Sequence, residues 1–255
     1  MLRDLKSNKS IFLIHKHNNP CGVAIRDSVI EAYEDALSCD NISAFGGILT
    51  CNQTIDKKSA DQINKLFFEI IIAPNYDNEA LTTLKSKKNR IIIKLNKIPA
   101  KIIQSRSCLD GFLEQDFDKK IENFNEFKVV TNLSPNNKNS DDLVLGSIIA
   151  KHTKSNCIVI VKNQQLIGSG MGQVSRIDAL DQAIEKSKKF GFELANSSLA
   201  SDAFFPFSDC VEISFKNGIN SIIQPGGSVR DQDSIDFCNE NEMSMVFSGI
   251  RHFRH

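Results

Sequence analysis

The sequence Ile158-Val159-Ile160-Val161-Lys162-Asn163-Gln164-Gln165-Leu166-Ile167-Gly168-Ser169-Gly170-Met171-Gly172 contains two apolar runs, a polar turn between them and a glycine-rich end. The two runs and their short turn predict a β-hairpin. The glycines lack the Gly-x-Gly-x-x-Gly spacing of a dinucleotide-binding loop, and no acidic residue ends a following strand. We therefore interpret them as positions of close backbone approach before a helix, which Ser175 caps and Gly191 ends.

The same order of strand, turn and helix recurs on both sides of this segment. Upstream, Ile11-Phe12-Leu13-Ile14 predicts a short buried strand that ends at a polar turn, His15 to Gly22. Asp27 can cap the helix that follows. Ile91-Ile92-Ile93 predicts another buried strand, and the tail alternates strand and helix up to a last strand ending at Phe247. This rhythm predicts a layered α/β fold.

Two further helices are predicted, one on each side of a polar region whose apolar residues follow no clear period. Helical spacing of apolar residues predicts helices over Asp56 to Glu69 and over Asp141 to Thr153. Between Glu114 and Asn139 the chain is polar and has no clear period. We place a soft boundary there, which gives two lobes of roughly 1–125 and 126–255.

Composition excludes several classes of protein. Among 255 residues, Lys plus Arg and Asp plus Glu both number 31, so there is no global basic field for nucleic acid. There is no apolar run of about 18 residues for a membrane span, and the charged start does not form a signal peptide. The seven cysteines are spread singly and indicate reduced thiols. We expect a cytoplasmic enzyme without a membrane or nucleic-acid partner.

A polar turn follows the first predicted strand and contains Lys16 and His17 side by side. Ligands bind beyond the carboxyl ends of strands in open α/β sheets. An imidazole can accept a proton from a nucleophile near neutral pH, and an ammonium can stabilise a developing oxyanion. These two residues are therefore candidate catalytic groups. The alternative is a solvated loop whose Asn and Pro residues form turns.

The last fifth of the chain combines aromatic, acidic and basic residues. Ser201 to Asp209 places three phenylalanines between two aspartates, Gln224 to Asp231 contains a Pro-Gly-Gly-Ser turn, and Arg251 to His255 is basic. Phenylalanines at strand spacing are usually core residues, and a basic tail is often frayed. Taken together, the three segments predict a pocket for a flat ring and an anion.

Metal chemistry is disfavoured. Pro20-Cys21 invites comparison with zinc deaminases, which use Pro-Cys-x-x-Cys and an upstream His-x-Glu. Here Ala24 stands at the second cysteine position and no His-x-Glu occurs. We expect no catalytic metal, and a zinc-dependent deaminase remains the weakest of the alternatives.

These segments, in this order, resemble the transformylase domain of the AICAR transformylase/IMP cyclohydrolase family, where AICAR is 5-aminoimidazole-4-carboxamide ribonucleotide. The matching segments span the whole chain, and together they are more specific than any one of them. They are Lys16 to Ala24, Ser43 to Gly47, Lys151 to Asn156, Gly172 to Ala179, Ser201 to Asp209, Gln224 to Asp231 and Arg251 to His255.

The resemblance implies a fold, a reaction and a partner. The fold would be a cytidine-deaminase-like three-layer α/β/α sandwich in two lobes, with no zinc and with the first lobe incomplete at its N-terminus. The 5-amino group of AICAR would take a formyl group from 10-formyltetrahydrofolate in the synthesis of IMP. His17 would act as general base, Lys16 would stabilise the formyl oxygen, and Asn156 would orient the reacting groups. The family also implies a homodimer with shared active sites.

The resemblance also implies two sets of binding residues. The nucleotide would contact Gly46, Glu69, Arg176 and Arg251. The folate would contact Ile177, Phe204, Asp209, Ser228 and Val229, with Phe204 against a flat ring.

The sequence departs from the family pattern at its beginning. The cyclohydrolase domain is absent, and so are the Arg-Tyr-Gly-Glu-Asn-Pro-His-Gln and Ser-Tyr-Asn-Asn segments of the transformylase domain. The first of these helps to hold the nucleotide in the family. The alternative interpretation is therefore a partial, inactive chain that binds folate or nucleotide, or that needs a partner polypeptide for activity.

Overall fold

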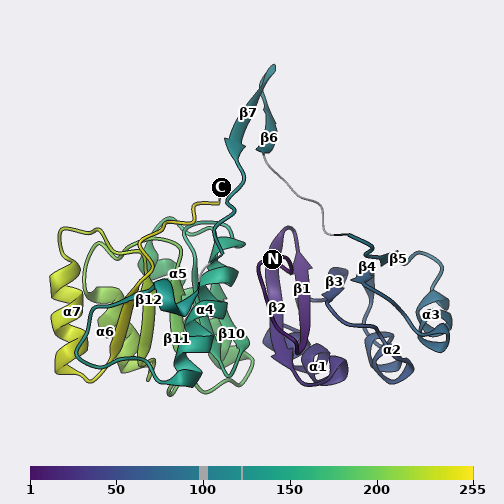
Figure 1. Ribbon diagram of the computed structural model, residues 1–255, viewed down its shortest axis with the longest axis horizontal. Coiled ribbons are helices and arrows are strands. Elements are labelled where there is room, and N and C mark those ends of the chain that lie inside the picture. The colour runs from purple at the N-terminus through teal and green to yellow at the C-terminus, as the bar shows by residue number, and fades with distance from the viewer. Residues whose placement is uncertain (98–102, 122, 255) are drawn as a thin grey trace.

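A computed structural model describes residues 1–97, 103–121 and 123–254. Within them, eleven strands form one mixed sheet with helices on its faces (Figure 1), which confirms the layered α/β prediction. In sheet order the strands are β5 (Ile91–Lys94), β4 (Phe68–Ala73), β3 (Gly47–Cys51), β1 (Ser10–Lys16), β2 (Asn19–Arg26), β10 (Gln165–Gly170), β9 (Ile158–Lys162), β11 (Ser198–Ser201), β12 (Ser221–Gln224), β13 (Ser244–Phe247) and β8 (Lys128–Val129).

Among the described residues, six α-helices cover one face of this sheet and one α-helix covers the other. The first face has three core helices in each half, which pack on two separate clusters of buried residues. These helices are α1 (Val29–Cys39), α2 (Lys57–Ile63), α3 (Asn78–Lys85), α5 (Arg176–Lys189), α6 (Asp209–Lys216) and α7 (Asp231–Glu240). The opposite face is covered by α4 (Asn137–Lys151), whose Leu143, Leu145 and Ile149 belong to a third cluster.

The predicted hairpin forms as β9 and β10, and its glycines let α5 pack directly on the sheet. A Cβ added to Gly170 would lie 1.8 Å from the carbonyl oxygen of Ala179, and one on Gly168 would lie 2.3 Å from that of Ala183. Ser175 caps α5 through its hydroxyl, which accepts a hydrogen bond from the Asp178 backbone N–H at 3.1 Å. The prediction of close backbone approach before a helix is therefore confirmed.

Several local predictions were wrong. The turn after β1 is only His17-Asn18, because both residues adopt left-handed φ angles of 49° and 63°, so Asn19 to Gly22 continues as β2. Ser28, not Asp27, caps α1, because its capping box with Glu31 satisfies backbone N–H groups in both directions.

The helix predicted over Asp56 to Glu69 is also shorter than expected. It ends at Ile63, and Phe68 starts β4 instead. Asp56 caps this helix as its acidic side chain suggests, accepting from the Ser59 backbone N–H at 2.8 Å. The helix predicted from Asp141 begins earlier, at Asn137, because Asn136 is its N-cap. The strand predicted over Ile91 to Ile93 forms as β5, but it is not buried, because β5 is an edge strand with one face that no described helix covers.

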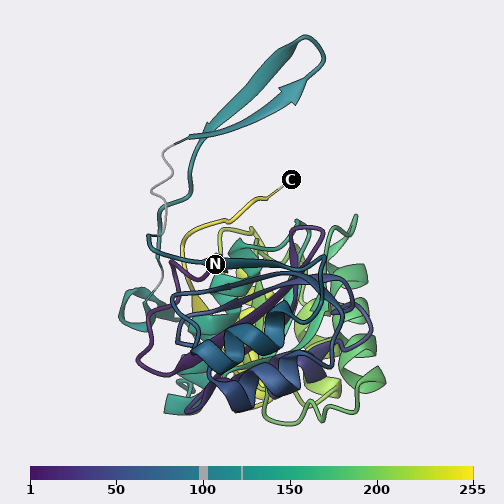
Figure 2. The same cartoon turned by 90° about the vertical axis from the view of Figure 1, so that its right-hand side faces the viewer.

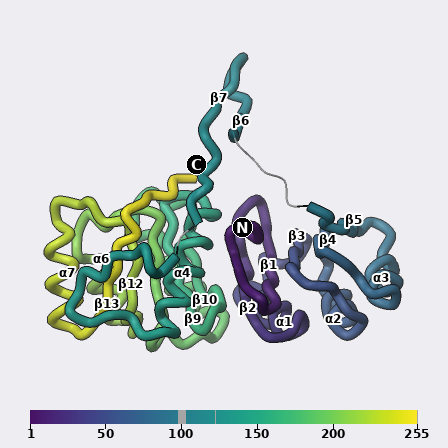
Figure 3. The backbone as a smooth tube through the Cα atoms, in the orientation of Figure 1, coloured from purple at the N-terminus to yellow at the C-terminus, as the bar shows by residue number. Residues whose placement is uncertain are grey.

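Two segments do not belong to the large sheet or its covering helices. The hairpin of β6 (Ile103–Cys108) and β7 (Gly111–Asp116), here called the arm, pairs only with itself and extends away from the sheet in both views (Figures 1 and 2). The C-terminal tail runs from β13 back toward the middle of the molecule (Figure 3). Among the described residues, no helix is long and apolar enough to cross a membrane.

Candidate active site

The predicted site residues gather along one end of the large sheet, which we call the site end. It is the end where β1 stops at Lys16 and β2 starts at Asn19. β3 and β4 begin there, and so does β9, because β9 is antiparallel to β10. β11, β12 and β13 finish there, since β11 is antiparallel to β9. Segments from both halves of the chain therefore meet at the site end.

Lys16, the last residue of β1, reaches the turn that precedes the neighbouring strand β3. Its ammonium donates a hydrogen bond to the Phe45 carbonyl. A Cβ on Gly46 would lie 3.0 Å from the same ammonium nitrogen, and Gly46 has a left-handed φ of +69°. The backbone conformation therefore favours a glycine there, while the flexible Lys16 side chain could shift to make room for a Cβ. The structure thus places Lys16 and Gly46 together.

His17 is exposed at the tip of the β1–β2 turn, and its neighbours tie that turn to the second half of the chain. The Asn19 side-chain oxygen accepts a hydrogen bond from the Lys154 backbone N–H at 3.1 Å. The Arg254 guanidinium donates to the Asn18 carbonyl at 2.9 Å and also to the His152 carbonyl. These contacts fix the turn that carries the catalytic candidates.

Asn156 lies two residues beyond Lys154 and immediately before β9. Its backbone exchanges hydrogen bonds with Gln173, at 3.3 Å in each direction, and the preceding Ser155 N–H donates to the Arg254 carbonyl at 2.8 Å. Asn156 is half-buried. The structure therefore brings the segment of Asn156 to the same place as the Lys16–Asn19 turn.

Arg176, predicted to contact the nucleotide, forms a buried ion pair instead of pointing freely into solvent. Its guanidinium lies 2.5 Å from Asp202 Oδ1, and its side chain is 8% exposed. The same carboxylate oxygen accepts from the Cys157 backbone N–H at 2.9 Å. Asp202 Oδ2 is buried and has no hydrogen-bond partner among the described residues. The pairing joins α5 to the ends of β9 and β11, and sequence analysis missed it because nothing local links positions 176 and 202.

The residues predicted on the folate side lie beyond β11 and β12, except Ile177, which follows β10. Phe204 is half-buried and Val229 is fully exposed. The backbone N–H groups of Gly227 and Ser228 donate to Asp231 at 2.6 and 3.2 Å, which shapes the turn before α7. Asp209 starts α6, and Ile177 lies in the first turn of α5.

Arg251 lies with this second set and not with Gly46. Its guanidinium carbon is 4.4 Å from the centre of the Phe204 ring, a cation–π contact. A Cβ on Gly227 would lie 3.8 Å from an Arg251 guanidinium nitrogen. The strand order puts four inter-strand steps between β1 and β11, which corresponds to roughly 19 Å. Gly46 and Glu69, which is exposed on β4, therefore lie apart from Phe204 and Arg251 within one chain, whereas Arg176 lies with Asp202 on the side of Phe204.

A network of charges joins four distant segments beside the β1–β2 turn. The buried Lys151 ammonium is 2.9 Å from Asp4 and 3.7 Å from Asp118. His152 lies 2.8 Å from the same Asp4 oxygen, and His252 lies 2.5 Å from Asp118. Burial alone would raise the pKa of Asp4, but hydrogen bonds from His152 and Lys151 hold it well below its usual range. Asp4 is therefore ionised at neutral pH.

Two histidines near this network are neutral at neutral pH. Burial lowers the pKa of His152 to about 4, against the opposing effect of Asp4, and burial also lowers the pKa of His15 to about 4. The unfolded chain then binds more protons than the folded chain between pH 4 and 6.5. The stability due to these two groups is complete above pH 6.5 and is lost as the pH falls toward 4.

We therefore predict that the unfolding free energy of His15→Gln falls less than that of the wild type as the pH is lowered from 7 to 4.5. Between pH 7 and 4.5 the wild-type chain should lose on the order of 2 kcal/mol more of its unfolding free energy than the variant. Guanidinium chloride titrations at the two pH values measure this difference. Burial raises the pKa of Asp142 to about 6, so its contribution to stability grows as the pH falls, opposite to that of His15. Both proteins contain Asp142, so this contribution cancels when their losses are compared. Equal losses in both proteins would show that His15 is not buried as a neutral group.

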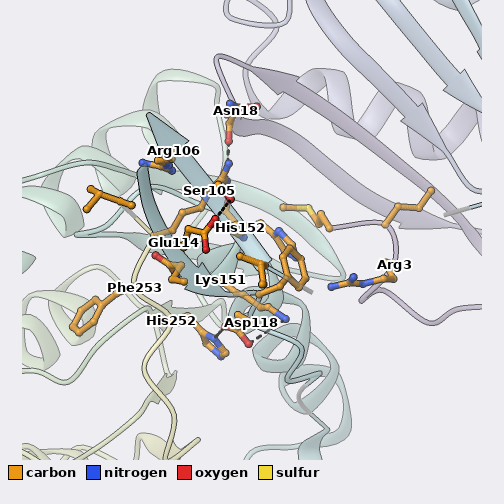
Figure 4. Close-up of a pocket in the computed structure, with 18 of the residues that line it drawn as sticks. Arg3, Asn18, Ser105, Arg106, Glu114, Asp118, Lys151, His152, His252 and Phe253 are labelled. Carbon is orange, nitrogen blue, oxygen red and sulfur yellow. Dashed lines mark hydrogen bonds and ion pairs between the residues drawn. The ribbon is translucent and has the colours of Figure 1, made fainter. Parts of the chain in front are cut away.

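A groove lies beside the site end and is separate from it. Its volume is about 790 Å³, and it is bounded by residues 1–3, the base of the arm, the end of α4 and the C-terminal tail (Figure 4). Asn18 reaches its rim. Among the described residues that line it, none is a predicted catalytic or binding residue. No group of three or more potential metal ligands occurs within the described part of the chain.

Comparisons with known proteins identify relatives along the whole chain. The family model described as AICARFT/IMPCHase bienzyme matches residues 1–186. Proteins named bifunctional purine biosynthesis protein PurH are 54% identical over 96% of this chain in Bacteroides thetaiotaomicron and 45% identical over 97% in Aquifex aeolicus. The match covers 48% of each relative, so the chain spans about half their length.

A solved structure also shows a weak likeness. It is the diaminohydroxyphosphoribosylaminopyrimidine deaminase/5-amino-6-(5-phosphoribosylamino)uracil reductase of Thermotoga maritima, 16% identical, with a TM-score of 0.31 over 42% of this chain and 34% of that one. A TM-score this low does not indicate a shared fold. The sequence relatives and the family model are decisive: the chain belongs to the AICARFT/IMPCHase bienzyme family.

Proposed function

We propose that this chain transfers a formyl group from 10-formyltetrahydrofolate to the 5-amino group of AICAR in the synthesis of IMP, in the cytoplasm. The observation that supports this most directly is the meeting of the Lys16–His17 turn with the segment of Asn156. The hydrogen bond between Lys154 and Asn19 holds these two segments together although they are far apart in the sequence. We further propose that each half of the sheet is built on the plan of cytidine deaminases.

In the proposed reaction the amine nitrogen attacks the formyl carbon while its proton passes to His17. The amine is a poor nucleophile because its lone pair is delocalised into the ring and the carboxamide, so a base must act during attack. Lys16 stabilises the negative charge that develops on the formyl oxygen. The C–N bond to the folate then breaks, and tetrahydrofolate leaves as its nitrogen regains a proton. Asn156 orients the reacting groups.

The binding residues divide according to their places in the sheet. Gly46 and Glu69, near Lys16, hold the nucleotide. Arg176 acts from its buried pair with Asp202 and orients the start of α5 toward the same ligand. Phe204 stacks on the flat ring of the folate, and Arg251 covers the other face of Phe204. Ile177, Asp209, Ser228 and Val229 complete the folate side.

A homodimer with shared sites accounts for the distance between the two sets. The spacing of roughly 19 Å between β1 and β11 is large for groups that act on one transferred carbon. A two-fold dimer that brings the site ends together would place the Lys16–His17 turn of one copy opposite Phe204 of the other. Sedimentation showing only monomer at the concentrations of a transfer assay would contradict this arrangement.

Calorimetry with AICAR and with a folate analogue, followed by a transfer assay with 10-formyltetrahydrofolate, tests the proposal. We expect the chain to bind both ligands and to form formyl-AICAR. Binding of folate without binding of nucleotide or turnover would instead support the partial, inactive chain. Zinc found by elemental analysis of active protein would contradict a metal-free transfer.

A further inference from the structure

The two halves of the large sheet repeat the same order of elements. The first half runs β1-β2-α1-β3-α2-β4-α3-β5, and the second runs β9-β10-α5-β11-α6-β12-α7-β13. The strands also pair in the same order, β2-β1-β3-β4-β5 and β10-β9-β11-β12-β13. In both, a glycine of the second strand contacts the next helix: a Cβ on Gly22 would lie 2.1 Å from the Ala36 carbonyl oxygen. The halves are therefore comparable element by element.

The comparison reveals one difference, on the face that α4 covers. In the second half, α4 packs on β9, β11 and β12 from the side opposite α5, α6 and α7. The buried cluster under α4 also contains Ile11 and Leu13 of β1, so these two side chains point to the same face of the sheet as α4. No described helix covers β3, β4 and β5 on that face.

The uncovered face is apolar. Leu49, Ile71 and Ile92 point to the helices of the first half, so their neighbours along each strand point to the other side. Ile48, Ile70 and Ile91 are paired across the three strands, as are Thr50, Ile72 and Ile93. These isoleucines belong to none of the buried clusters, and Ile91 and Ile93 are 53% and 38% exposed. Parallel strands are almost always covered on both faces, so this surface is suited to a partner.

The groove described above passes along this face. Thr50, Ile72 and Leu95 line it on the sheet side, and Ile103 and Leu113 line it at the base of the arm. Its lining contains three arginines against two carboxylates, while the buried Lys151 is already paired with acidic groups. Of these, Arg3, Arg106, Glu114 and Asp118 are labelled in Figure 4, and Arg254 is the third arginine. Three strands span roughly 10 Å, which is the width of a single helix.

We propose that this face docks one amphipathic α-helix, placed over β3 and β4 as α4 is placed over β11 and β12. Its apolar side would pack on the isoleucine rows, and its acidic residues would meet Arg3 and Arg106. The helix comes from the part of the PurH relatives that this chain does not match, since the match covers only 48% of their length. The proposal rests on family membership and on the repeat, and not on formyl transfer.

The test mixes this chain with a polypeptide comprising the unmatched part of the Bacteroides thetaiotaomicron relative. Sedimentation velocity should show a 1:1 complex, and hydrogen exchange should slow in the edge strand β5. Ile91→Asp and Ile93→Asp should each weaken the complex by about tenfold or more, because each buries a charge in the contact. Both residues are exposed on an edge strand, so these variants should fold. Co-expression and co-purification of the two polypeptides repeats the test if the added polypeptide is insoluble alone.

Ile42→Asp is the matched control, since Ile42 is 63% exposed but lies between α1 and β3, outside this face. It should bind like the wild type. Absence of a complex in both formats, or equal binding by Ile93→Asp, would overturn the proposal. So would a dimer of this chain alone that Ile93→Asp dissociates, because a second copy would then be the occupant. The test measures binding and not turnover, so its outcome can be interpreted even if the chain does not catalyse the proposed formyl transfer.

Discussion

Replacing His17 by Ala is expected to lower the rate of formyl transfer to AICAR by about 10²-fold or more. His17 is exposed at the tip of the β1–β2 turn, and it is the proposed acceptor of the amine's proton. A steady-state assay of formyl-AICAR formation measures the change. Lys16→Ala should give a comparable loss, because the developing charge on the formyl oxygen would lose its cation.

His17→Asn separates chemistry from turn geometry. His17 has a φ of 49°, which Asn tolerates better than most residues, so this variant keeps the turn and removes the base. It should be as slow as His17→Ala. Asn163→Ala is the matched control, because Asn163 is an exposed residue with a φ of 51° in the β9–β10 turn at the other end of the sheet. Robust transfer by His17→Ala would show that another group is the base.

The sequence was most informative where local chemistry decides the structure. The hairpin and the helix capped by Ser175 follow from turn and capping preferences, and both form. The hairpin turn is Asn163-Gln164, one residue later than the predicted Lys162-Asn163. Boundaries failed where two local signals competed. Asn19 to Gly22 is rich in turn-forming residues, yet pairing with β1 makes it a strand once His17 and Asn18 have completed the turn.

Candidate site residues could be named one by one from the sequence, but their arrangement could not be predicted. Strand order places Arg251 against Phe204, and a contact between positions 251 and 204 has no local signature. The same is true of the pair of Arg176 and Asp202, whose members belong to segments that were considered separately. Tertiary packing decides such pairings. The division into lobes near residue 125, and the roles of the individual site residues, remain predictions.

Gly170→Ala is expected to destabilise the chain by about 3 kcal/mol or more, or to prevent folding. The new Cβ would lie 1.8 Å from the carbonyl oxygen of Ala179, and an atom of the helix backbone cannot turn aside as a flexible side chain can. The whole of α5 would have to move away from β10. Gly22→Ala should behave similarly, since its Cβ would meet the Ala36 carbonyl oxygen of α1 at 2.1 Å. Guanidinium chloride unfolding measures both.

Gly111→Ala is the control, because Gly111 also lies in a strand but its Cβ would have no neighbour closer than 3.9 Å. Its stability should change by less than about 0.5 kcal/mol. A Gly170→Ala protein as stable as this control would mean that α5 does not rest on the sheet as described. The consequence reaches the site as well, because α5 begins at Arg176. Moving the helix outward pulls that guanidinium from Asp202 and leaves a buried carboxylate without its cation, a cost added to the steric one. The glycines that first indicated a strand followed by a helix thus also set the position of a site residue.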